Sequence, residues 1–286
     1  MSALSDGLAK MCKANRDGSH ATQNNRLRSL LKIAKDLEKE CGYKLPSPRS
    51  LKPKHPADLV KLYMRHGVSD RTIANRLAHI RWWANKVNKE KMLPIKNASY
   101  GIGGSTPKTD RAKPLNYDKV SKVSCQLVQA SLQLQAAFGL RREEAIKFHP
   151  SCADKGGAIQ LKGSWCKGGR EREIPITHPK QRKILDQIHK LVGEGHLIPK
   201  GKNYIEQLKT YEHQTIKAGL RNNHGLRHQW AQWRYRQLTG WKCPNDGGQP
   251  YEALNTKQKR KDRQARIRIS REMGHDRIAI TRTYLG

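Results

Sequence analysis

The sequence predicts a mainly α-helical protein with one small β-sheet, divided between two domains. Apolar residues recur at three- and four-residue spacing along most of the chain, whereas the alternation of a strand occurs in only two short segments. Residues 97–114 are rich in glycine, serine, threonine and proline and show no periodicity, as expected of a linker. The length of 286 residues suits two domains. We therefore place a first domain at 1–100, a linker at 101–114 and a second domain at 115–286.

Three helices are expected in the first domain, each from apolar residues at helical spacing. The first covers residues 22–41, and the second is a short helix at 57–65. The third begins at a candidate N-cap, Ser69 or Asp70, and runs to Lys89. Its second face is basic, which is typical either of a solvated surface or of a helix that grips DNA. The basic side chains on that face are Arg71, Arg76, Arg81, Lys86 and Lys89.

The second domain is expected to contain two helices within 116–148, followed by a hairpin and further helices. Short alternating segments at 158–162 and 170–176 flank Lys167 and two glycines, which predicts a β-hairpin with a glycine turn. Helical spacing then resumes in four segments. These are 180–192, 205–217, 226–238 and 269 to the end of the chain.

The charge of the chain indicates a polyanionic partner. Lys and Arg number 57 against 24 Asp and Glu, a net charge of +33 that is spread over both domains. Nucleic acid is the first candidate for the partner and an acidic membrane surface is the second. Residues 257–268 hold seven basic residues and one acidic one, so we expect a loop or helix start over the phosphate backbone, the alternative being a solvated charge run.

Other sequence features exclude several protein classes. No apolar run approaches the roughly 18 residues of a membrane span, and the N-terminus does not resemble a signal peptide, so we expect a cytoplasmic protein. The 6 cysteines form no Cys-x-x-Cys pair and no Cys/His cluster at zinc-ligand spacing. Reduced thiols are therefore expected, although six cysteines would also allow three disulfides.

Two local patterns in the second domain could bind an anion. Gly-Leu-Arg141 is followed by Glu144 three residues after the arginine, on the same face if a helix begins there. Alone, this pair is more typical of a surface ion pair. His224 and Arg227 stand three residues apart at an expected helix start, where backbone N–H groups and the helix dipole favour negative charge.

A third pattern, Gly-His275 followed by Tyr284, completes an ordered set. In this order the patterns resemble the tyrosine recombinase (phage integrase) family. The catalytic domain of that family has an arginine in Gly-Leu-Arg-x-x-Glu, a lysine in a β-hairpin turn, His-x-Leu-Arg-His, and Leu-Gly-His followed by a tyrosine. The resemblance implies a helical core-binding domain ahead of an α+β catalytic domain. The catalytic residues that it implies are Arg141, Lys167, His224, Arg227, His275 and Tyr284.

The roles that the resemblance implies agree with the chemistry of these side chains. Tyr284 would attack the scissile phosphate and form a 3′-phosphotyrosyl link, which preserves the bond energy for rejoining. The planar guanidinium groups of Arg141 and Arg227 suit bidentate binding of a pentacoordinate phosphate. No metal or cofactor is implied.

Three further residues complete the implied proton and phosphate chemistry. Lys167, in the hairpin turn, would protonate the leaving 5′-oxygen. His224 would assist proton transfer at the tyrosine or bind the phosphate, and His275 would donate a hydrogen bond to a phosphate oxygen. Glu144 is expected to be structural.

Two of these assignments have rivals in the sequence. Lys162 competes with Lys167, but it lies in the expected strand rather than in the turn. Arg142 competes with Arg141, but the Gly-Leu-Arg alignment favours Arg141. His228 is expected to be a supporting or core residue.

The ends of the chain give two further expectations. Tyr284 stands two residues before the end, so we expect it in a frayed turn that is mobile without DNA, and the exchange of a C-terminal segment between protomers is in doubt. Little chain precedes the first expected helix, so we expect no additional arm-site-binding domain.

The resemblance predicts a site-specific recombinase that integrates or excises a phage or genomic island. Its expected partners are double-stranded DNA, three further copies in a tetramer on the DNA, and accessory DNA-bending proteins, with no membrane, in the bacterial cytoplasm at the nucleoid. Two alternatives stay open. One is a type IB topoisomerase, which shares the catalytic set, and the other is a catalytically silent DNA-binding or architectural protein.

Overall fold

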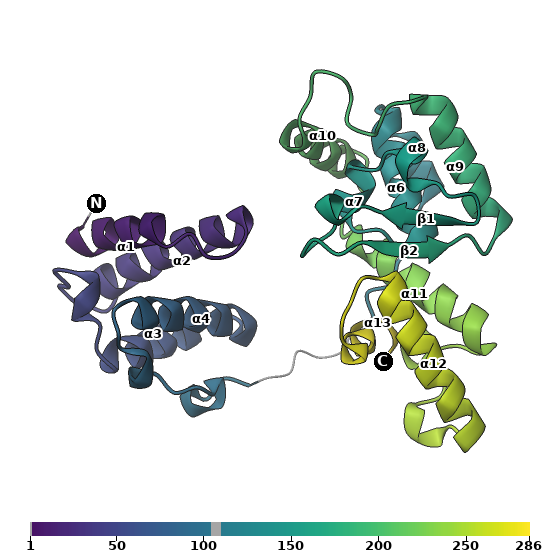
Figure 1. Cartoon of the computed structure of the whole chain (residues 1–286). Helices are drawn as coiled ribbons and strands as arrows, with labels where there is room; N and C mark the ends of the chain where they lie inside the picture. Colours follow the sequence, from purple (N-terminus) through teal and green to yellow (C-terminus); the bar gives the residue numbers. More distant parts are fainter. Residues whose placement is uncertain (1, 104–109) are drawn as a thin grey trace. The chain divides into compact units, whose positions relative to one another are not determined.

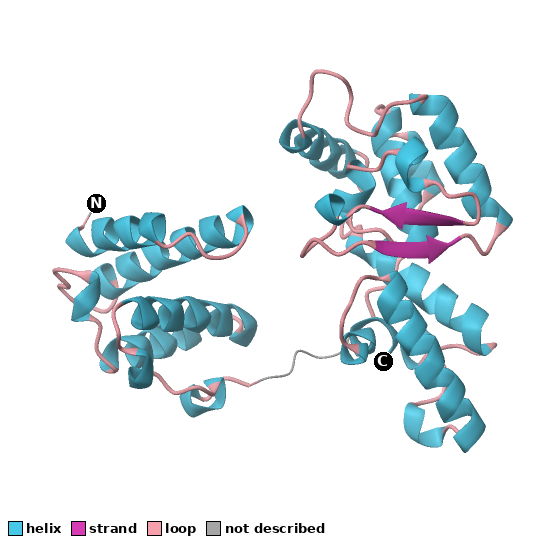
Figure 2. Cartoon of the chain, viewed as in Figure 1, coloured by secondary structure: helices cyan, strands magenta, loops and turns pink. Residues whose placement is uncertain are grey.

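The computed structural model describes residues 2–103 and 110–286, in two compact units, Met1–Pro107 and Lys108–Gly286 (Figure 1). The part of the expected linker at 104–109 lies outside the described residues. The prediction of a mainly helical fold with a small sheet is confirmed, and Figure 2 shows a single two-stranded sheet in the second unit. Among the described helices, none combines the length and apolar character that a membrane crossing requires.

Four helices build the first unit. They are α1 (Ala3–Ala14), α2 (His20–Lys39), α3 (Lys54–Arg65) and α4 (Asp70–Lys86). Ser19 and Ser69 cap α2 and α4, since each hydroxyl accepts a hydrogen bond from the backbone three residues later. The core between the helices is centred on Trp83, whose side chain is 0% exposed and whose indole N–H donates to the Pro48 carbonyl at 2.9 Å.

Helix α1 was not predicted, because its apolar pattern is short and interrupted by Gly7. Leu4 and Leu8 are both buried, and α1 packs along α2. A side chain at Gly7 would collide with the ring of Pro48, where a Cβ would lie 2.5 Å from Cδ. Tertiary packing therefore fixes a helix that local propensity leaves undecided.

Two helices were expected within residues 116–148, but the structure has three there and a fourth directly after them. They are α5 (Tyr117–Ser121), α6 (Gln126–Phe138), α7 (Arg142–Ile146) and α8 (Pro150–Ala153). The chain leaves α6 at Gly139, which has a φ of +62°, and then runs extended through Arg141 before α7 begins.

The expected hairpin is present. Strands β1 (Ala158–Leu161) and β2 (Arg172–Pro175) pair antiparallel, with Ile159 opposite Ile174, and both isoleucines are fully buried. The connection between the strands includes a 3₁₀ turn at Gly163–Trp165 and the turn that carries Lys167.

The remaining helices are α9 (Pro179–Val192), α10 (Tyr204–Lys217), α11 (His224–Thr239), α12 (Thr256–Glu272) and α13 (Arg282–Leu285). The expectation of a helix from residue 269 to the end is wrong. Helix α12 begins at Thr256, capped by Asn255, so the basic run 257–268 is helical; of the loop and the helix start that the sequence allowed, the structure has the helix. It ends before Gly274, whose φ of +65° a continuing helix cannot accommodate.

Candidate active site

Arg141 is held at the junction of α6 and α7. A Cβ at Gly139 would lie 2.5 Å from the Trp230 ring, so only glycine allows the chain to turn here against α11. The backbone N–H of Arg141 donates to Glu144 Oε2 at 2.6 Å, and its guanidinium Nη1 donates to Oε1 at 2.8 Å. The arginine is thereby fixed at both its main chain and its side chain, while 21% of the side chain stays exposed.

Glu144 is the buried centre of an ion-pair network. Its carboxylate is 0% exposed and accepts two hydrogen bonds from Arg172, at 2.6 and 3.0 Å. Burial raises the pKa of Glu144, but the hydrogen bonds and charge of Arg172, together with the charges of Arg227 and Arg141, lower it to about 2 overall. The carboxylate is therefore ionised at neutral pH, as an orienting role requires.

Arg227 lies on the first turn of α11 with only 1% of its surface exposed. Its guanidinium donates to the backbone carbonyls of Gly139 and Met273 and lies 3.4 Å from Nε2 of His275. Its Nε has no hydrogen-bond partner among the described residues. Burial and the charge of Arg141 lower the pKa of Arg227 to about 10, so it stays protonated at neutral pH.

Tyr284 packs among three histidines. The ring centroids lie 4.4 Å from His228, 5.7 Å from His275 and 6.3 Å from His224. The expectation of a frayed terminal turn is wrong, because Tyr284 is only 5% exposed and the next residue, Leu285, is fully buried. The turn is packed because Leu285 belongs to the main hydrophobic core of this unit and Arg266 donates to the Gly286 carbonyl at 2.8 Å.

The histidines of the cluster are neutral at physiological pH. Desolvation and the charges of Arg227 and Arg141 lower the pKa of His224, and the same causes lower that of His275 to about 4. Burial and the neighbouring His224 lower the pKa of His228 to about 4. Neutral imidazoles beside a tyrosine can accept its proton or hydrogen-bond a phosphate.

Comparison with known proteins agrees with this geometry. The family described as "Integrase" matches residues 101–233, and the family described as "Phage integrase, N-terminal" matches residues 1–93. The chain belongs to the tyrosine recombinase (phage integrase) family. It is a site-specific DNA recombinase, and neither the topoisomerase nor the silent DNA-binding alternative is favoured. No curated protein matches the chain.

Solved structures share the fold of the recombinase at low sequence identity. The XerH recombinase bound to its difH substrate has a TM-score of 0.57 and 19% identity over 99% of this chain and 81% of its own. A lambda integrase dimer bound to a COC′ core site has a TM-score of 0.65 and 14% identity over 98% and 76%. The Tn1549 transposon integrase with circular intermediate DNA has a TM-score of 0.58 and 14% identity over 100% and 95%.

Lys167 stands apart from the cluster. It is exposed in the hairpin turn, where the Gly169 N–H donates to the Cys166 carbonyl at 3.1 Å, and no contact in the described part of the recombinase joins it to Tyr284. Its rival Lys162 lies over Trp165, with Nζ 5.8 Å from the ring centroid. The structure therefore brings together Arg227, His224, His275 and Tyr284, with Arg141 electrostatically coupled to the group, and leaves Lys167 at the surface.

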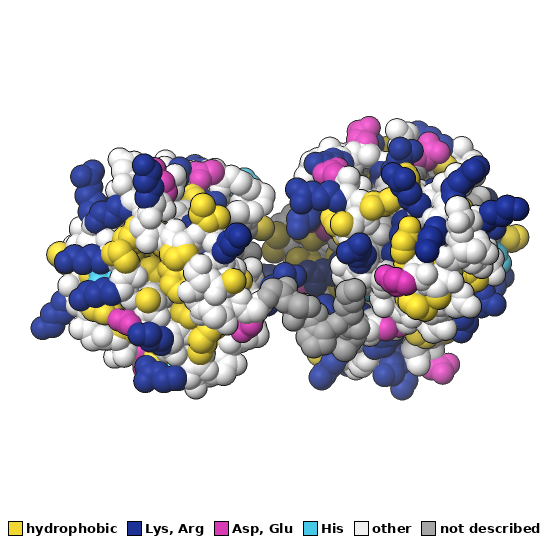
Figure 3. Space-filling model, turned by 90° about the horizontal axis from the view of Figure 1, so that it is seen from below, with side chains coloured by type: hydrophobic (Ala, Val, Ile, Leu, Met, Phe, Trp, Pro, Cys, Tyr) yellow, Lys and Arg dark blue, Asp and Glu magenta, His cyan; other side chains and the backbone are white. Residues whose placement is uncertain are grey.

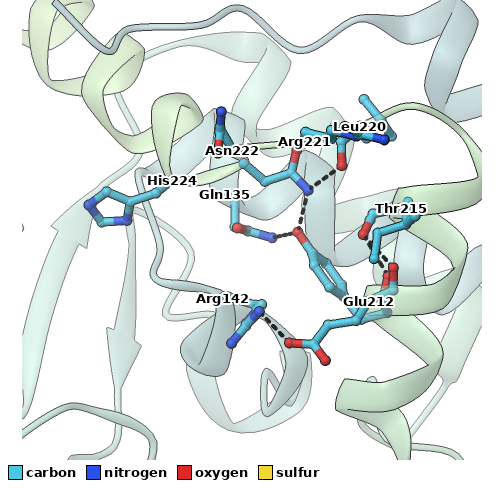
Figure 4. Close-up of a pocket in the computed structure, with 11 residues that line it drawn as sticks. Gln135, Arg142, Glu212, Thr215, Leu220, Arg221, Asn222 and His224 are labelled. Carbon is cyan, nitrogen blue, oxygen red and sulfur yellow. Dashed lines mark hydrogen bonds and ion pairs between the residues drawn. The ribbon is translucent and has the colours of Figure 1, made fainter. Parts of the chain in front are cut away.

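Arg142 forms an ion pair with a residue outside the cluster. It pairs with Glu212 at 2.8 Å on the edge of a cavity of about 750 Å³ that also borders His224. Figure 4 shows this pair at one side of the cavity and His224 at another. Two other residues that line the cavity bind each other, since the Tyr211 hydroxyl accepts a hydrogen bond from the Gln135 amide at 2.9 Å. Arg142 is thus engaged elsewhere, in agreement with the choice of Arg141.

Sequence reasoning missed Arg172 and treated His228 only as a supporting residue. Arg172 and Ile174 alternate with exposed residues along β2, so the strand pattern points Arg172 into the interior, a signal that was available in the sequence. His228 is 2% exposed and has the closest ring contact with Tyr284. The six cysteines all carry free thiols in the structure.

Proposed function

We propose that the recombinase cuts and rejoins DNA with Tyr284 as the nucleophile. The observation that carries the proposal is the meeting of Tyr284 on α13 with His224 and Arg227 on α11 and with His275 in the segment that follows α12. A buried arginine with a neighbouring tyrosine and neutral imidazoles is suited to phosphoryl transfer, since it supplies both charge stabilisation and proton acceptors.

In the proposed step the Tyr284 oxygen attacks the scissile phosphorus, a P–O bond to tyrosine forms, and the P–O5′ bond breaks. The phenolic proton passes to a neutral imidazole of His224 or His275, and the leaving 5′-oxygen takes a proton from Lys167. Arg227 and Arg141 bind the non-bridging oxygens as charge builds in the transition state. Attack by a free 5′-hydroxyl on the phosphotyrosine reverses the step and rejoins the strand.

The exposed turn of Lys167 suits a residue that reaches the DNA only when the duplex is bound. Gly168 and Gly169 have φ of +79° and +71°, and a Cβ at either would meet no other atom. The turn is thus free to approach a groove without steric conflict. The turn exposes the Lys167 ammonium at the surface of the domain, as the proposed acid requires.

The first unit is proposed to grip the duplex, as the core-binding domain. Figure 3 shows Lys and Arg side chains over the visible face of each unit, in larger number than Asp and Glu. Exchange between two duplexes requires four strand cleavages, so we propose a homotetramer on double-stranded DNA, with accessory bending proteins. The proposed setting is the bacterial nucleoid and the integration or excision of a phage or genomic island.

A suicide-substrate trap tests this function. A nicked duplex from the junction of the mobile element is incubated with wild type, Tyr284→Phe and the control Tyr251→Phe, which changes an exposed tyrosine. We expect a covalent protein–DNA band on a denaturing gel from wild type and Tyr251→Phe only. Tight binding without any covalent band would favour a silent DNA-binding protein, and relaxation of any plasmid by a monomer would favour a topoisomerase.

A further inference from the structure

We propose that Arg172 is a positioning residue that fixes three separate parts of the active site through one guanidinium group. This inference rests on the proposed function, because it concerns the same cleavage step. Arg172 touches neither Tyr284 nor His275 through any described hydrogen bond. It binds instead three groups next to parts of the site. These are Glu144, which binds Arg141, Cys166, which precedes Lys167, and the Glu272 carbonyl at the end of α12.

The contacts of Arg172 use all three guanidinium nitrogens. Nη1 and Nη2 donate to the two carboxylate oxygens of Glu144 at 3.0 and 2.6 Å, and Nε donates to the Glu272 carbonyl at 2.9 Å. Nη1 also donates a hydrogen bond to Sγ of Cys166 at 3.1 Å. The side chain is 4% exposed, so water does not compete for these contacts.

The first contact sets the position of Arg141. Glu144 binds both the backbone N–H and the guanidinium of Arg141, and Arg172 holds that carboxylate from the opposite side. Without Arg172, Arg141 would be the one described side chain that donates hydrogen bonds to the Glu144 carboxylate, with Arg227 acting on it only through its charge. The guanidinium of Arg141 would then be drawn inward and away from a phosphate.

The second contact reaches the hairpin turn. Cys166, which is 9% exposed, directly precedes Lys167, so the bond from Arg172 anchors the base of the turn while its tip stays exposed. We infer that this anchor limits the positions from which Lys167 can reach the leaving oxygen.

The third contact fixes the end of α12. The Glu272 carbonyl binds Arg172, and the next carbonyl, of Met273, binds Arg227. Gly274 follows, and a Cβ there would lie 3.1 Å from Cδ and Nη1 of Arg172. The glycine thus makes room for Arg172 and turns the chain toward His275.

Arginine is required for this arrangement, since a planar fork supplies donors in three directions and an ammonium does not. Replacement by lysine retains the charge opposite Glu144 but loses the simultaneous contacts to Glu272 and Cys166. Buried ion pairs contribute little net stability. We therefore expect Arg172→Lys to affect cleavage far more than folding.

The chain offers a matched control in Arg234. This arginine also forms a doubly hydrogen-bonded buried pair, with Glu272 at 2.8 and 2.9 Å, and both side chains are 5% exposed. Arg234 binds the carboxylate of Glu272 and not the backbone carbonyl that binds Arg172, and it makes no described contact with Glu144 or Cys166. Arg234→Lys thus reproduces the loss of a buried bidentate pair without touching Arg141 or the hairpin turn.

The test compares wild type, Arg172→Lys and Arg234→Lys in single-turnover cleavage of the nicked duplex, with the affinity for DNA and the melting temperature measured in parallel. We expect Arg172→Lys to lose about 100-fold in cleavage rate with affinity changed less than about threefold, the scale of an ångström-sized misplacement. Arg234→Lys is expected to lower the melting temperature by about as much as Arg172→Lys does, while cleaving at nearly the wild-type rate. Equal cleavage by wild type and Arg172→Lys, or equal losses in the two variants, would overturn the proposal.

A double variant keeps the test valid if Arg172→Lys does not fold. Arg172→Met with Glu144→Gln removes both buried charges together, and we expect it to fold and bind DNA but to cleave slowly. Cleavage at the wild-type rate by a folded double variant would contradict the positioning role. Failure of wild type itself to form the covalent complex would instead refute the proposed function.

A second substrate isolates the hairpin contact. A sulfur atom in place of the bridging 5′-oxygen leaves as a thiolate and needs no proton from Lys167. We expect the deficit of Arg172→Lys to shrink on this substrate but not to vanish, because Arg141 is still misplaced. A deficit of the same size on both substrates would refute the part of the proposal that concerns Cys166 and Lys167.

Discussion

Arg227 and Lys167 are proposed to act on the same phosphodiester, yet the recombinase holds them in opposite ways. Arg227 is 1% exposed and bound to two backbone carbonyls from different elements, whereas Lys167 is exposed in a turn bounded by glycines. We infer that the proposed phosphate-binding part is assembled before DNA arrives. We propose that the acid, by contrast, reaches its working position only when the duplex is bound. Preorganised charge near the phosphate avoids reorganisation during the reaction.

The largest effect is expected from Arg227→Lys. Lysine cannot bind the Gly139 and Met273 carbonyls and a phosphate together, so we expect cleavage to fall by about 10³-fold. The buried carbonyls also lose their donors, so the melting temperature should fall as well. Single-turnover cleavage and a thermal melt measure both. An unchanged cleavage rate would show that this part of the site is not assembled in advance.

Lys167→Ala is expected to reduce cleavage by about 100-fold, the scale of a general acid, and to leave the melting temperature unchanged because the side chain is exposed. Lys162→Ala is the control and should cleave as wild type does. The bridging-sulfur substrate should restore the Lys167→Ala variant. A larger loss in Lys162→Ala would transfer the role of acid to that residue.

The smallest effect concerns the buried histidine and is seen in stability. The pKa of His228 is lowered from 6.5 to about 4. As pH falls from about 6.5 to about 4, the unfolded chain binds a proton that the folded chain does not, so the free energy of unfolding decreases. The measurement is the free energy of unfolding from chemical denaturation at pH 7 and at pH 4.5. We expect the decrease between these two pH values to be smaller in His228→Gln than in wild type by about 1–3 kcal/mol. The exposed His213, changed to Gln, should leave it unaltered.

The sequence could predict the elements and residues that local patterns specify. Helices such as α2 and α4 and the hairpin follow from periodicity, since each buries one face against its neighbours. The motif order predicted six residues as one site. The structure brings His224, Arg227, His275 and Tyr284 together, couples Arg141 to them electrostatically, and leaves Lys167 at the surface.

What escaped prediction depends on contacts between distant segments. Arg172 meets Glu144 and the Glu272 carbonyl across 28 and 100 residues, and no local pattern specifies such partners. The packed turn at Tyr284 depends likewise on the burial of Leu285 and on Arg266. The length of α12 was missed because its basic run was expected to be a loop or only a helix start over the phosphate backbone, or else a solvated charge run.

The central claim is that Tyr284 is the nucleophile, and identification of the linked peptide tests it most directly. The covalent complex of wild type is digested with trypsin and nuclease and analysed by mass spectrometry. Cleavage after Arg282 releases residues 283–286, and the account predicts that this peptide carries the nucleotide on Tyr284. A nucleotide attached to any other residue, such as Tyr251, would contradict it.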